Sequence, residues 1–191
     1  MAIKQIRLCG FGGQGIILAG TILGHAGIND GKWVAGSNSY GAAARGGACR
    51  AEVVISDKPI VFPLVIKADI LVAMSQKVYD EYIEEVGENG IVIYDEMVSI
   101  NKASHLEQVG IPATNVAVRE LNNKQVANAI ILGAAVEMTK IVSRDALISA
   151  IESNVQVGLQ ALNLKALELG FKLGSMKIRG KLWQKEEYKD L

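Results

Sequence analysis

The chain has 191 residues, enough for one domain with an appended arm, and half of them are hydrophobic, so a sizeable core can be buried. Its 20 Lys and Arg balance its 20 Asp and Glu, and this zero net charge argues against nucleic-acid binding over the whole surface. No apolar run is long enough to span a membrane, and the N-terminus has no signal-peptide core. With only two cysteines, we expect a cytoplasmic protein with no zinc or iron–sulfur site of its own.

The first half of the chain is predicted to alternate strands with helices. The elements are, in order, a strand at 3–9, a glycine-rich loop at 10–15, a helix at 16–28, strands at 32–37 and 48–56 joined by a loop at 38–47, a strand at 69–74, a helix at 75–86, a turn at 87–90 and a strand at 91–94. The strand at 69–74 is apolar without interruption, as expected in a sheet that is covered on both faces.

The second half is predicted to be mostly helical. Its elements are a short helix at 104–109, a weak strand at 113–118, one long helix at 121–142, and helices at 143–155 and 159–169, the last ended by Gly170. The whole order predicts an α/β fold with a doubly wound, mostly parallel sheet in three layers, followed by C-terminal helices. The composition changes after residue 174, and we expect residues 175–191 to form a terminal arm that either frays or docks on a partner subunit.

Gly10, Gly12 and Gly15 form a Gly-x-Gly-x-x-Gly motif between the first strand and the first helix. Glycine allows positive φ angles and the close approach of a phosphate, and the following helix presents free N–H groups to an anion. The motif therefore predicts binding of a phosphate or another acidic group, with a tight turn that binds nothing as the alternative. A nicotinamide dinucleotide is disfavoured, because residues 35–38 contain no acidic residue that would bind its ribose.

A second motif, Ser-Tyr-Gly-Ala-Ala-Ala-Arg-Gly-Gly, occupies residues 39–47. Arg45 offers a rigid fork of donors that suits phosphate or carboxylate, and Gly46 and Gly47 leave backbone N–H groups open. Tyr40 can stack on a base or pack against another chain. The alternative is a flexible surface loop. We expect this segment and the first glycine loop to face one shared cleft.

Few residues favour nucleophilic catalysis. The chain has no Gly-x-Ser-x-Gly motif, Cys9 is expected to be a small buried residue, and His25 is expected to be packed in the core. Asp95 and Glu96 follow a strand and are interpreted as solvated loop residues, with magnesium or hydroxyl binding as the alternative. We therefore assign no catalytic or metal-binding residue.

Taken together, the two motifs resemble the gamma subunit of the 2-oxoacid:ferredoxin oxidoreductases. The resemblance rests on Gly-Phe-Gly-Gly-Gln-Gly at 10–15 combined with the motif at 39–47, and on the stretches at 111–114 and 128–133. It spans about residues 3–165. Ala43 departs from the family pattern, in which an acidic or other polar residue often precedes Ala-Arg-Gly-Gly.

The resemblance implies a Rossmann-like domain at residues 1–174 that helps to bind coenzyme A and packs on alpha and beta subunits, and on a delta subunit where the complex has one. Such enzymes oxidatively decarboxylate a 2-oxoacid to acyl-CoA, CO2 and reduced ferredoxin. Thiamine diphosphate, magnesium and iron–sulfur clusters are expected only in partner subunits, since the chain has no Gly-Asp-Gly thiamine motif and no Cys-x-x-Cys run. The chain alone is therefore expected to be inactive. The coenzyme A residues that the resemblance implies are Gly10, Gly12, Gly13, Gln14, Gly15, Ser39, Tyr40, Arg45, Gly46 and Gly47.

The identity of the 2-oxoacid stays open at this point. A separate chain of this size is most similar to the 2-oxoglutarate enzyme, while pyruvate, branched-chain and indolepyruvate versions are alternatives. A stand-alone NAD- or flavin-dependent oxidoreductase, and a scaffold that binds no ligand, are competing hypotheses of other classes.

Overall fold

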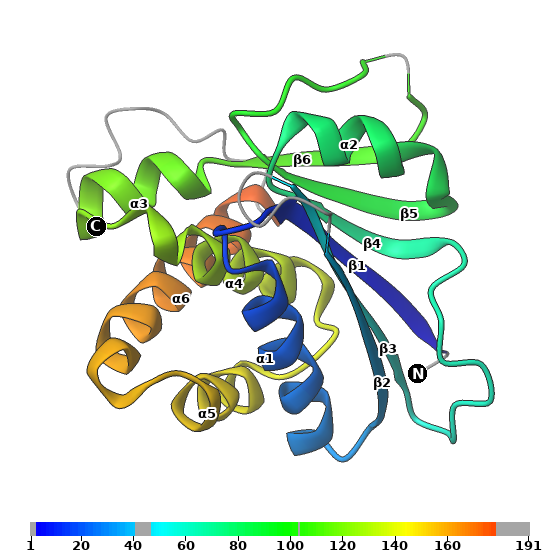
Figure 1. The fold of residues 1–191 in the computed structure, drawn as a ribbon, viewed down its shortest axis with the longest axis horizontal. Coiled ribbons are helices and arrows are strands. Elements are labelled where there is room, and N and C mark those ends of the chain that lie inside the picture. Colours follow the sequence, from blue (N-terminus) through cyan, green and yellow to red (C-terminus); the bar gives the residue numbers. More distant parts are fainter. Residues whose placement is uncertain (1–2, 41–46, 103, 179–191) are drawn as a thin grey trace.

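The computed structural model describes residues 3–40, 47–102 and 104–178 (Figure 1). A six-stranded sheet with the order β2-β3-β1-β4-β5-β6 forms its centre. The strands are β1 (Lys4–Phe11), β2 (Trp33–Tyr40), β3 (Ala48–Ser56), β4 (Ala68–Ala73), β5 (Val86–Asp95) and β6 (Glu107–Ile111). β4 pairs in parallel with β1 and with β5, and β5 pairs in parallel with β6. β3 runs antiparallel to both β1 and β2. The predicted mostly parallel sheet is confirmed, with an antiparallel hairpin at one edge.

Helices cover both faces of this sheet. They are α1 (Ile16–Asn29), α2 (Gln76–Tyr82), α3 (Ala113–Leu121), α4 (Ala127–Thr139), α5 (Arg144–Asn154) and α6 (Val157–Ile178), with short 3-10 turns at Ile83–Glu85 and Lys124–Val126. α2 packs on one face through a small apolar cluster, and α1, α4, α5 and α6 build the larger core on the other face (Figure 1). The three-layer α/β fold is therefore as predicted.

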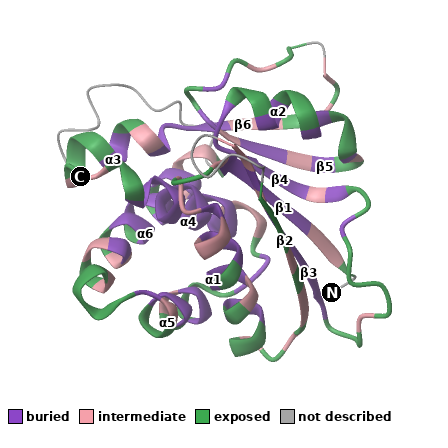
Figure 2. Ribbon diagram, viewed as in Figure 1, coloured by how far each residue is buried: buried purple, intermediate pink, exposed green. Residues whose placement is uncertain are grey.

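α4 is the central helix of the larger core. Every residue from Ala127 to Glu137 is buried, and Figure 2 shows this helix as a continuous buried segment beside the central strands. Two glycines allow α6 to pack closely against it. A Cβ on Gly170 would overlap the carbonyl oxygen of Ile130, and a Cβ on Gly133 would lie 2.6 Å from the carbonyl oxygen of Leu167. A helix that is apolar on most faces is stable here because helices and strands surround it.

Two predicted elements after β5 are wrong. Residues 104–109 are not a helix, because β6 occupies Glu107–Ile111 and pairs with β5. Residues 113–118 are not a strand but the start of α3. The cause is tertiary: the Asp95 carboxylate accepts hydrogen bonds from the Thr114 backbone N–H at 2.9 Å and from its hydroxyl at 2.6 Å. This capping of the first helical turn outweighs the local β preference of the valines in the segment.

The long helix predicted at 121–142 is shorter in the structure, because α4 covers only Ala127–Thr139 of it. Leu121 is the last residue of α3, Asn122 follows with a left-handed φ of 48°, and the 3-10 turn at Lys124–Val126 precedes α4. Lys140, with a φ of 52°, then ends α4. Asn tolerates the left-handed conformation at a helix end, which explains the first break.

The remaining differences concern glycines. Residues 87–90 belong to β5 rather than to a turn, since β5 begins at Val86 opposite Ala68. α6 does not end at Gly170 but continues to Ile178, because that glycine faces α4. The helix thus passes residue 174, where we place the boundary of the arm. Residues 179–191 lie outside the described residues, so the arm stays a prediction.

Glu137 joins the three C-terminal helices and gives the fold a specific pH dependence. Its carboxylate lies 2.8 Å from both Arg144 Nε and Lys140 Nζ, and it accepts a hydrogen bond from Ser175 Oγ at 2.8 Å. The hydrogen bond from Arg144 is the main cause that lowers the pKa of Glu137 from 4.5 to about 2. Because the folded pKa lies below the ordinary value, these contacts stabilise the fold above about pH 4.5, and this contribution is lost as the pH falls towards 2.

We therefore expect the difference in unfolding free energy between the wild type and Glu137→Gln to shrink as the pH falls from 4.5 towards 2. Urea denaturation at a series of pH values measures this difference. Glu152→Gln, at an exposed position on α5, is the matched control and should show a small, constant difference. A Glu137→Gln difference that does not change with pH would contradict the argument.

Candidate functional site

The glycine loop joins β1 to α1 at the carboxyl end of the parallel strands. Gly13 and Gly15 have φ angles of 98° and 70°, which glycine adopts without strain. Gly15 is the N-cap of α1 and offers no side chain, and among the described residues no other side chain caps this helix. The first N–H groups of α1 and the positive end of its dipole are thus available to an anion.

Gln14 holds this loop in place. Its Oε1 accepts a hydrogen bond from the Phe11 backbone N–H at 2.6 Å, and its Nε2 donates to the Met74 carbonyl oxygen at 3.0 Å. A Cβ on Gly10 would lie 2.6 Å from Gln14 Oε1, so this glycine makes room for the clamp. Both residues were predicted as ligand contacts, and the contacts that the structure shows for them are within the protein.

Asn128 is a functional candidate that sequence reasoning missed. It lies on α4, is only 4% exposed, and donates a hydrogen bond from Nδ2 to the Gly15 carbonyl oxygen at 3.1 Å. The side chain therefore fixes the start of α1 from across the core. The sequence placed Asn128 in a stretch that resembles the family, but a residue 113 positions away from Gly15 carried no signal of contact.

The second motif is partly a strand. Ser39 and Tyr40 belong to β2, where they pair with Arg50 and Cys49, so the loop predicted to begin at residue 38 is wrong at residues 38–40. Arg45 and Gly46 lie outside the described residues. The Gly47 carbonyl oxygen accepts a hydrogen bond from the Gly12 N–H at 3.0 Å. The last residue of the second motif is thus hydrogen-bonded to the first glycine loop.

A cleft of about 560 Å³ opens beside the first loop. Its walls come from the carboxyl ends of several strands and from the elements that follow them, and consist of Phe11, Gly12, Gly13, Gln14, Met74, Ser75, Gln76, Met97, Val98, Thr114, Lys124, Gln125 and Ala127. The described residues of the second motif do not line it. Its volume suits a small-molecule ligand, and its place at the strand ends is where α/β domains bind ligands.

Two polar groups in the cleft were not predicted. Lys124 is exposed and places a cation on the wall that faces the glycine loop. The Ser75 hydroxyl is buried and has no hydrogen-bond partner among the described residues. Buried polar groups are normally paired, so an unpaired hydroxyl on the wall of a cleft is a group that a ligand can satisfy.

Asp95 is fully buried, so it is not the solvated loop residue that we expected. Its carboxylate accepts hydrogen bonds from Thr114 and from the Met97 N–H, and these contacts leave it a structural role. Glu96 pairs with Lys177 at 3.3 Å. The described residues hold no cluster of three His, Cys, Asp or Glu side chains that would bind a metal ion.

Of the two burial predictions for His25 and Cys9, only the one for Cys9 is confirmed. His25 is exposed on α1, so its expected place in the core is wrong. Cys9 is fully buried, as predicted, and burial raises the pKa of its thiol far above the ordinary value. In the part of the chain that the structure describes, no Cys, His or carboxylate side chain lines the cleft. Lys124 is the one charged residue among the described lining residues.

A three-layer α/β domain with a glycine loop and a lysine around one cleft at the strand ends belongs to the class of Rossmann-like α/β domains. The chain belongs to the pyruvate ferredoxin/flavodoxin oxidoreductase family, whose model matches residues 5–173. This match confirms the resemblance found in the two motifs.

Three similar proteins narrow the comparison. The chain is 47% identical over 174 residues to the 2-oxoglutarate synthase subunit KorC of Methanocaldococcus jannaschii, covering 89% of this chain and 93% of the relative. It is 36% identical, with a TM-score of 0.80, to the gamma subunit of a keto/oxoacid ferredoxin oxidoreductase from Geobacter sulfurreducens, covering 90% and 98% of the two chains. The chain shares its fold, with a TM-score of 0.84 at 21% identity, with the 2-oxoglutarate:ferredoxin oxidoreductase of Magnetococcus marinus. The match covers 92% of this chain and 31% of that one, whose structure was solved with 2-oxoglutarate, coenzyme A and succinyl-CoA bound.

No helix in the described ranges is both long enough and apolar enough to cross a lipid bilayer.

Proposed function

We propose that the chain is the gamma subunit of a 2-oxoacid:ferredoxin oxidoreductase that acts on 2-oxoglutarate. The high identity to a 2-oxoglutarate synthase subunit over nearly its whole length supports this substrate over pyruvate, branched-chain and indolepyruvate alternatives. Family membership favours the subunit over a stand-alone NAD- or flavin-dependent enzyme. The complex would convert the 2-oxoacid and coenzyme A to acyl-CoA, CO2 and reduced ferredoxin in the cytoplasm. Thiamine diphosphate, magnesium and iron–sulfur clusters belong to its alpha and beta subunits, and to a delta subunit where the complex has one.

The contribution of this chain is to hold part of coenzyme A, and the cleft at the N-terminus of α1 is the observation that carries the proposal. Coenzyme A bears a pyrophosphate and a ribose phosphate. The N–H group of Gly13, the dipole of α1 and Lys124 supply the positive partners that these groups need. Arg45, which follows the β2 strand, is proposed as a further cation for the same ligand. The thioester chemistry would then take place on the partner subunits, and the lack of a Cys, His or carboxylate side chain among the described lining residues supports this division.

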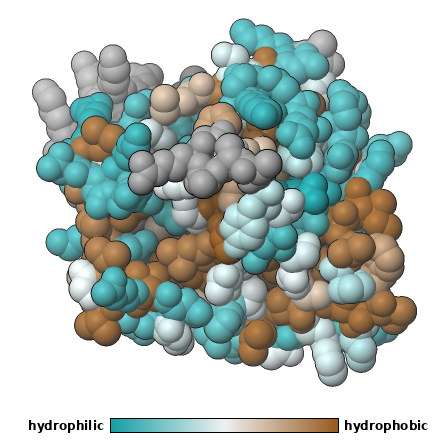
Figure 3. All heavy atoms as spheres, in the orientation of Figure 1, coloured by the Kyte–Doolittle hydropathy of each residue, from teal (hydrophilic) through white to brown (hydrophobic). Residues whose placement is uncertain are grey.

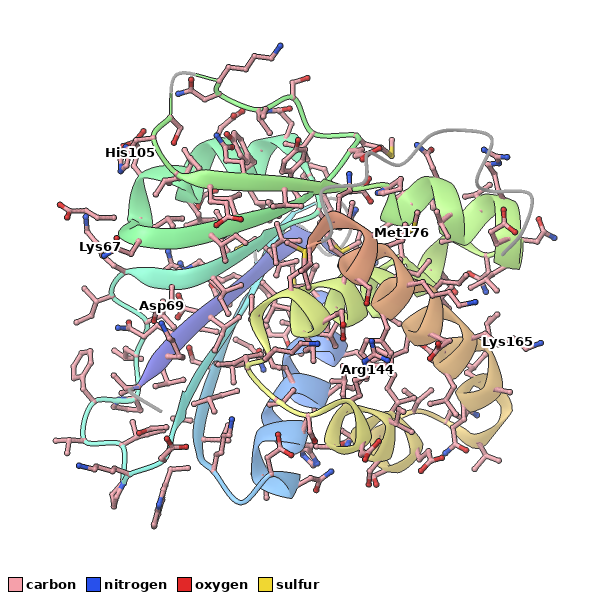
Figure 4. All side chains as sticks on the ribbon, turned by 180° about the vertical axis from the view of Figure 1, so that it is seen from behind. Lys67, Asp69, His105, Arg144, Lys165 and Met176 are labelled. Atoms are coloured by element: carbon pink, nitrogen blue, oxygen red, sulfur yellow. The ribbon has the colours of Figure 1, made fainter. Side chains whose placement is uncertain are left out.

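The test is Lys124→Ala in the reconstituted complex. Losing one charge-assisted phosphate contact of about 1.5 kcal/mol or more should raise the KM for coenzyme A roughly tenfold, with kcat and the KM for 2-oxoglutarate nearly unchanged. Lys165→Ala is the matched control, since Lys165 lies on α6 (Figure 4) and does not line the cleft. An unchanged KM for coenzyme A would instead support a scaffold that binds no ligand.

A further inference from the structure

The segment that joins β3 to β4 is apolar and exposed. We call residues 60–66 the apolar strap. Val61 is 96% exposed, Ile66 65%, Phe62 52% and Leu64 50%. Figure 3 shows hydrophobic side chains gathered on the right of the molecule, where Figure 1 places this connection. Exposed apolar residues are common singly, but a contiguous group of large ones indicates an interaction site.

The strap is fixed to the sheet rather than loosely attached. Val65 is its buried residue and packs with Val54 and Ala68. The Ile66 N–H donates to Gln5 Oε1 at 2.6 Å, and Arg7 Nη2 donates to the Val65 carbonyl oxygen at 3.4 Å. The backbone of the strap at Val65 and Ile66 is therefore held in place before any partner binds, which lowers the entropic cost of an interface.

Neighbouring residues extend the apolar surface and give it a polar rim. Trp33 is 55% exposed and pairs with Ser56, the residue that leads into the connection, and Ile3 is 45% exposed just before β1. The ends of the connection carry charged side chains, namely Asp57, Lys58, Lys67 and Asp69. An apolar centre with a charged rim is the usual anatomy of a protein–protein interface.

The position of the strap leaves the cleft accessible. Lys4 and Ala68 begin β1 and β4 at the strap, whereas the cleft lies beyond the carboxyl ends of the same strands. Figure 4 shows Lys67 and Asp69 on the opposite side of the molecule from Lys165. A partner can therefore cover the strap while coenzyme A enters the other end of the sheet.

The exposed area of the strap bears on which protein covers it, a second copy of this chain or a different polypeptide. The exposed residues of the strap and Ile3 together expose on the order of 500 Å², which is the size of the largest apolar patch on many monomers, and such patches are often functional. This is less than the roughly 800 Å² per partner of a standard stable interface, so the patch suits the centre of a larger contact. In the Magnetococcus enzyme the shared fold covers only 31% of its chain, so most of that polypeptide lies outside this domain. These observations favour a large, different polypeptide over a second copy of this chain.

We propose that the apolar strap is the surface on which a catalytic subunit of the oxidoreductase docks. This proposal rests on the function proposed above. The partner surface would be apolar at its centre and would carry both signs of charge at its edge, opposite the mixed rim of the strap.

The experiment compares two variants of the full-length chain. The double variant Val61→Asp/Ile66→Asp places charges in the proposed interface, and Val157→Asp is the control, because Val157 is 81% exposed at the start of α6. Each is mixed with the purified thiamine- and cluster-bearing subunits of the same enzyme, and the dissociation constant is measured. We expect at least tenfold weaker assembly for the double variant and an unchanged constant for the control. Both should keep the wild-type unfolding midpoint and the wild-type affinity of the isolated chain for coenzyme A.

The possible results separate the two proposals. If the wild type and the double variant assemble equally well, the docking surface is wrong and the subunit function stands. If the wild type self-associates and only that association is lost in the double variant, the strap joins two copies and the proposal is overturned. A wild-type chain that fails to assemble with these subunits at all overturns the subunit function and the docking surface together.

Discussion

Replacing Arg7 with Met is expected to lower the free energy of unfolding by about 3–5 kcal/mol. The Arg7 side chain is buried within the sheet, where Nε donates to Glu52 Oε1 at 2.8 Å and Nη1 pairs with Glu85. The guanidinium also lies over the ring of Tyr82, with its carbon 4.9 Å from the ring centre. Without it the buried Glu52 carboxylate keeps Arg50 Nε, at 3.6 Å, as its remaining described counter-charge, and a poorly compensated buried charge costs more than the lost pair contributed. Urea denaturation measures the loss.

Two further variants test whether the buried charge of Glu52 causes this loss of stability. Lys4→Met removes an ion pair with Asp69 whose side chains are both partly exposed, and it should cost about 1 kcal/mol or less. Arg7→Met combined with Glu52→Leu removes both buried charges and should recover much of the stability that Arg7→Met loses. A single Arg7→Met variant that is nearly as stable as the wild type would show that Glu52 does not depend on this arginine.

Gly170→Ala is expected to destabilise the fold by about 3 kcal/mol, because it inserts a methyl group into a closely packed helix crossing. The added Cβ would overlap the Ile130 carbonyl oxygen and lie 3.0 Å from the Ala134 backbone nitrogen. Both are main-chain atoms of α4, so no flexible side chain can move aside. α6 must therefore shift away from α4, which opens the larger core. The thermal unfolding midpoint should fall accordingly.

The matched control is Gly158→Ala at the other end of the same helix. A Cβ there would meet no atom within 4 Å, and the position is helical. Replacing glycine by alanine at such a site should raise the unfolding free energy by about 0.5 kcal/mol, chiefly through the unfolded chain. If both glycine variants changed stability by the same amount, helix propensity rather than packing would explain Gly170.

Local signals predicted the glycine loop because its requirements are local. Gly13 and Gly15 need left-handed φ angles, and a helix that begins directly after them exposes its N–H groups whatever lies elsewhere. The roles of Gln14 and Asn128 were not predictable in this way. Their partners, Met74 and Gly15, are 60 and 113 positions distant in the chain.

Contacts between residues distant in the chain also explain the wrong predictions after β5. The valines of residues 113–118 favour a strand locally, but Asp95 at the end of β5 caps the segment as a helix. Lys124 joins the cleft only because the break at Asn122 turns the chain back towards the glycine loop. Neither contact is encoded in a short-range pattern.

Taken alone, the sequence determined the α/β class, the strand–loop–helix that starts the domain and the family to which the chain belongs, since periodicity and motif spacing are properties of neighbouring residues. Only the tertiary structure decided which side chains line the cleft, that Arg7 and Glu52 form a buried pair, and that the strap turns its apolar side chains outward. These features depend on contacts between residues far apart in the chain, and such contacts exist only once the sheet and its helices have packed.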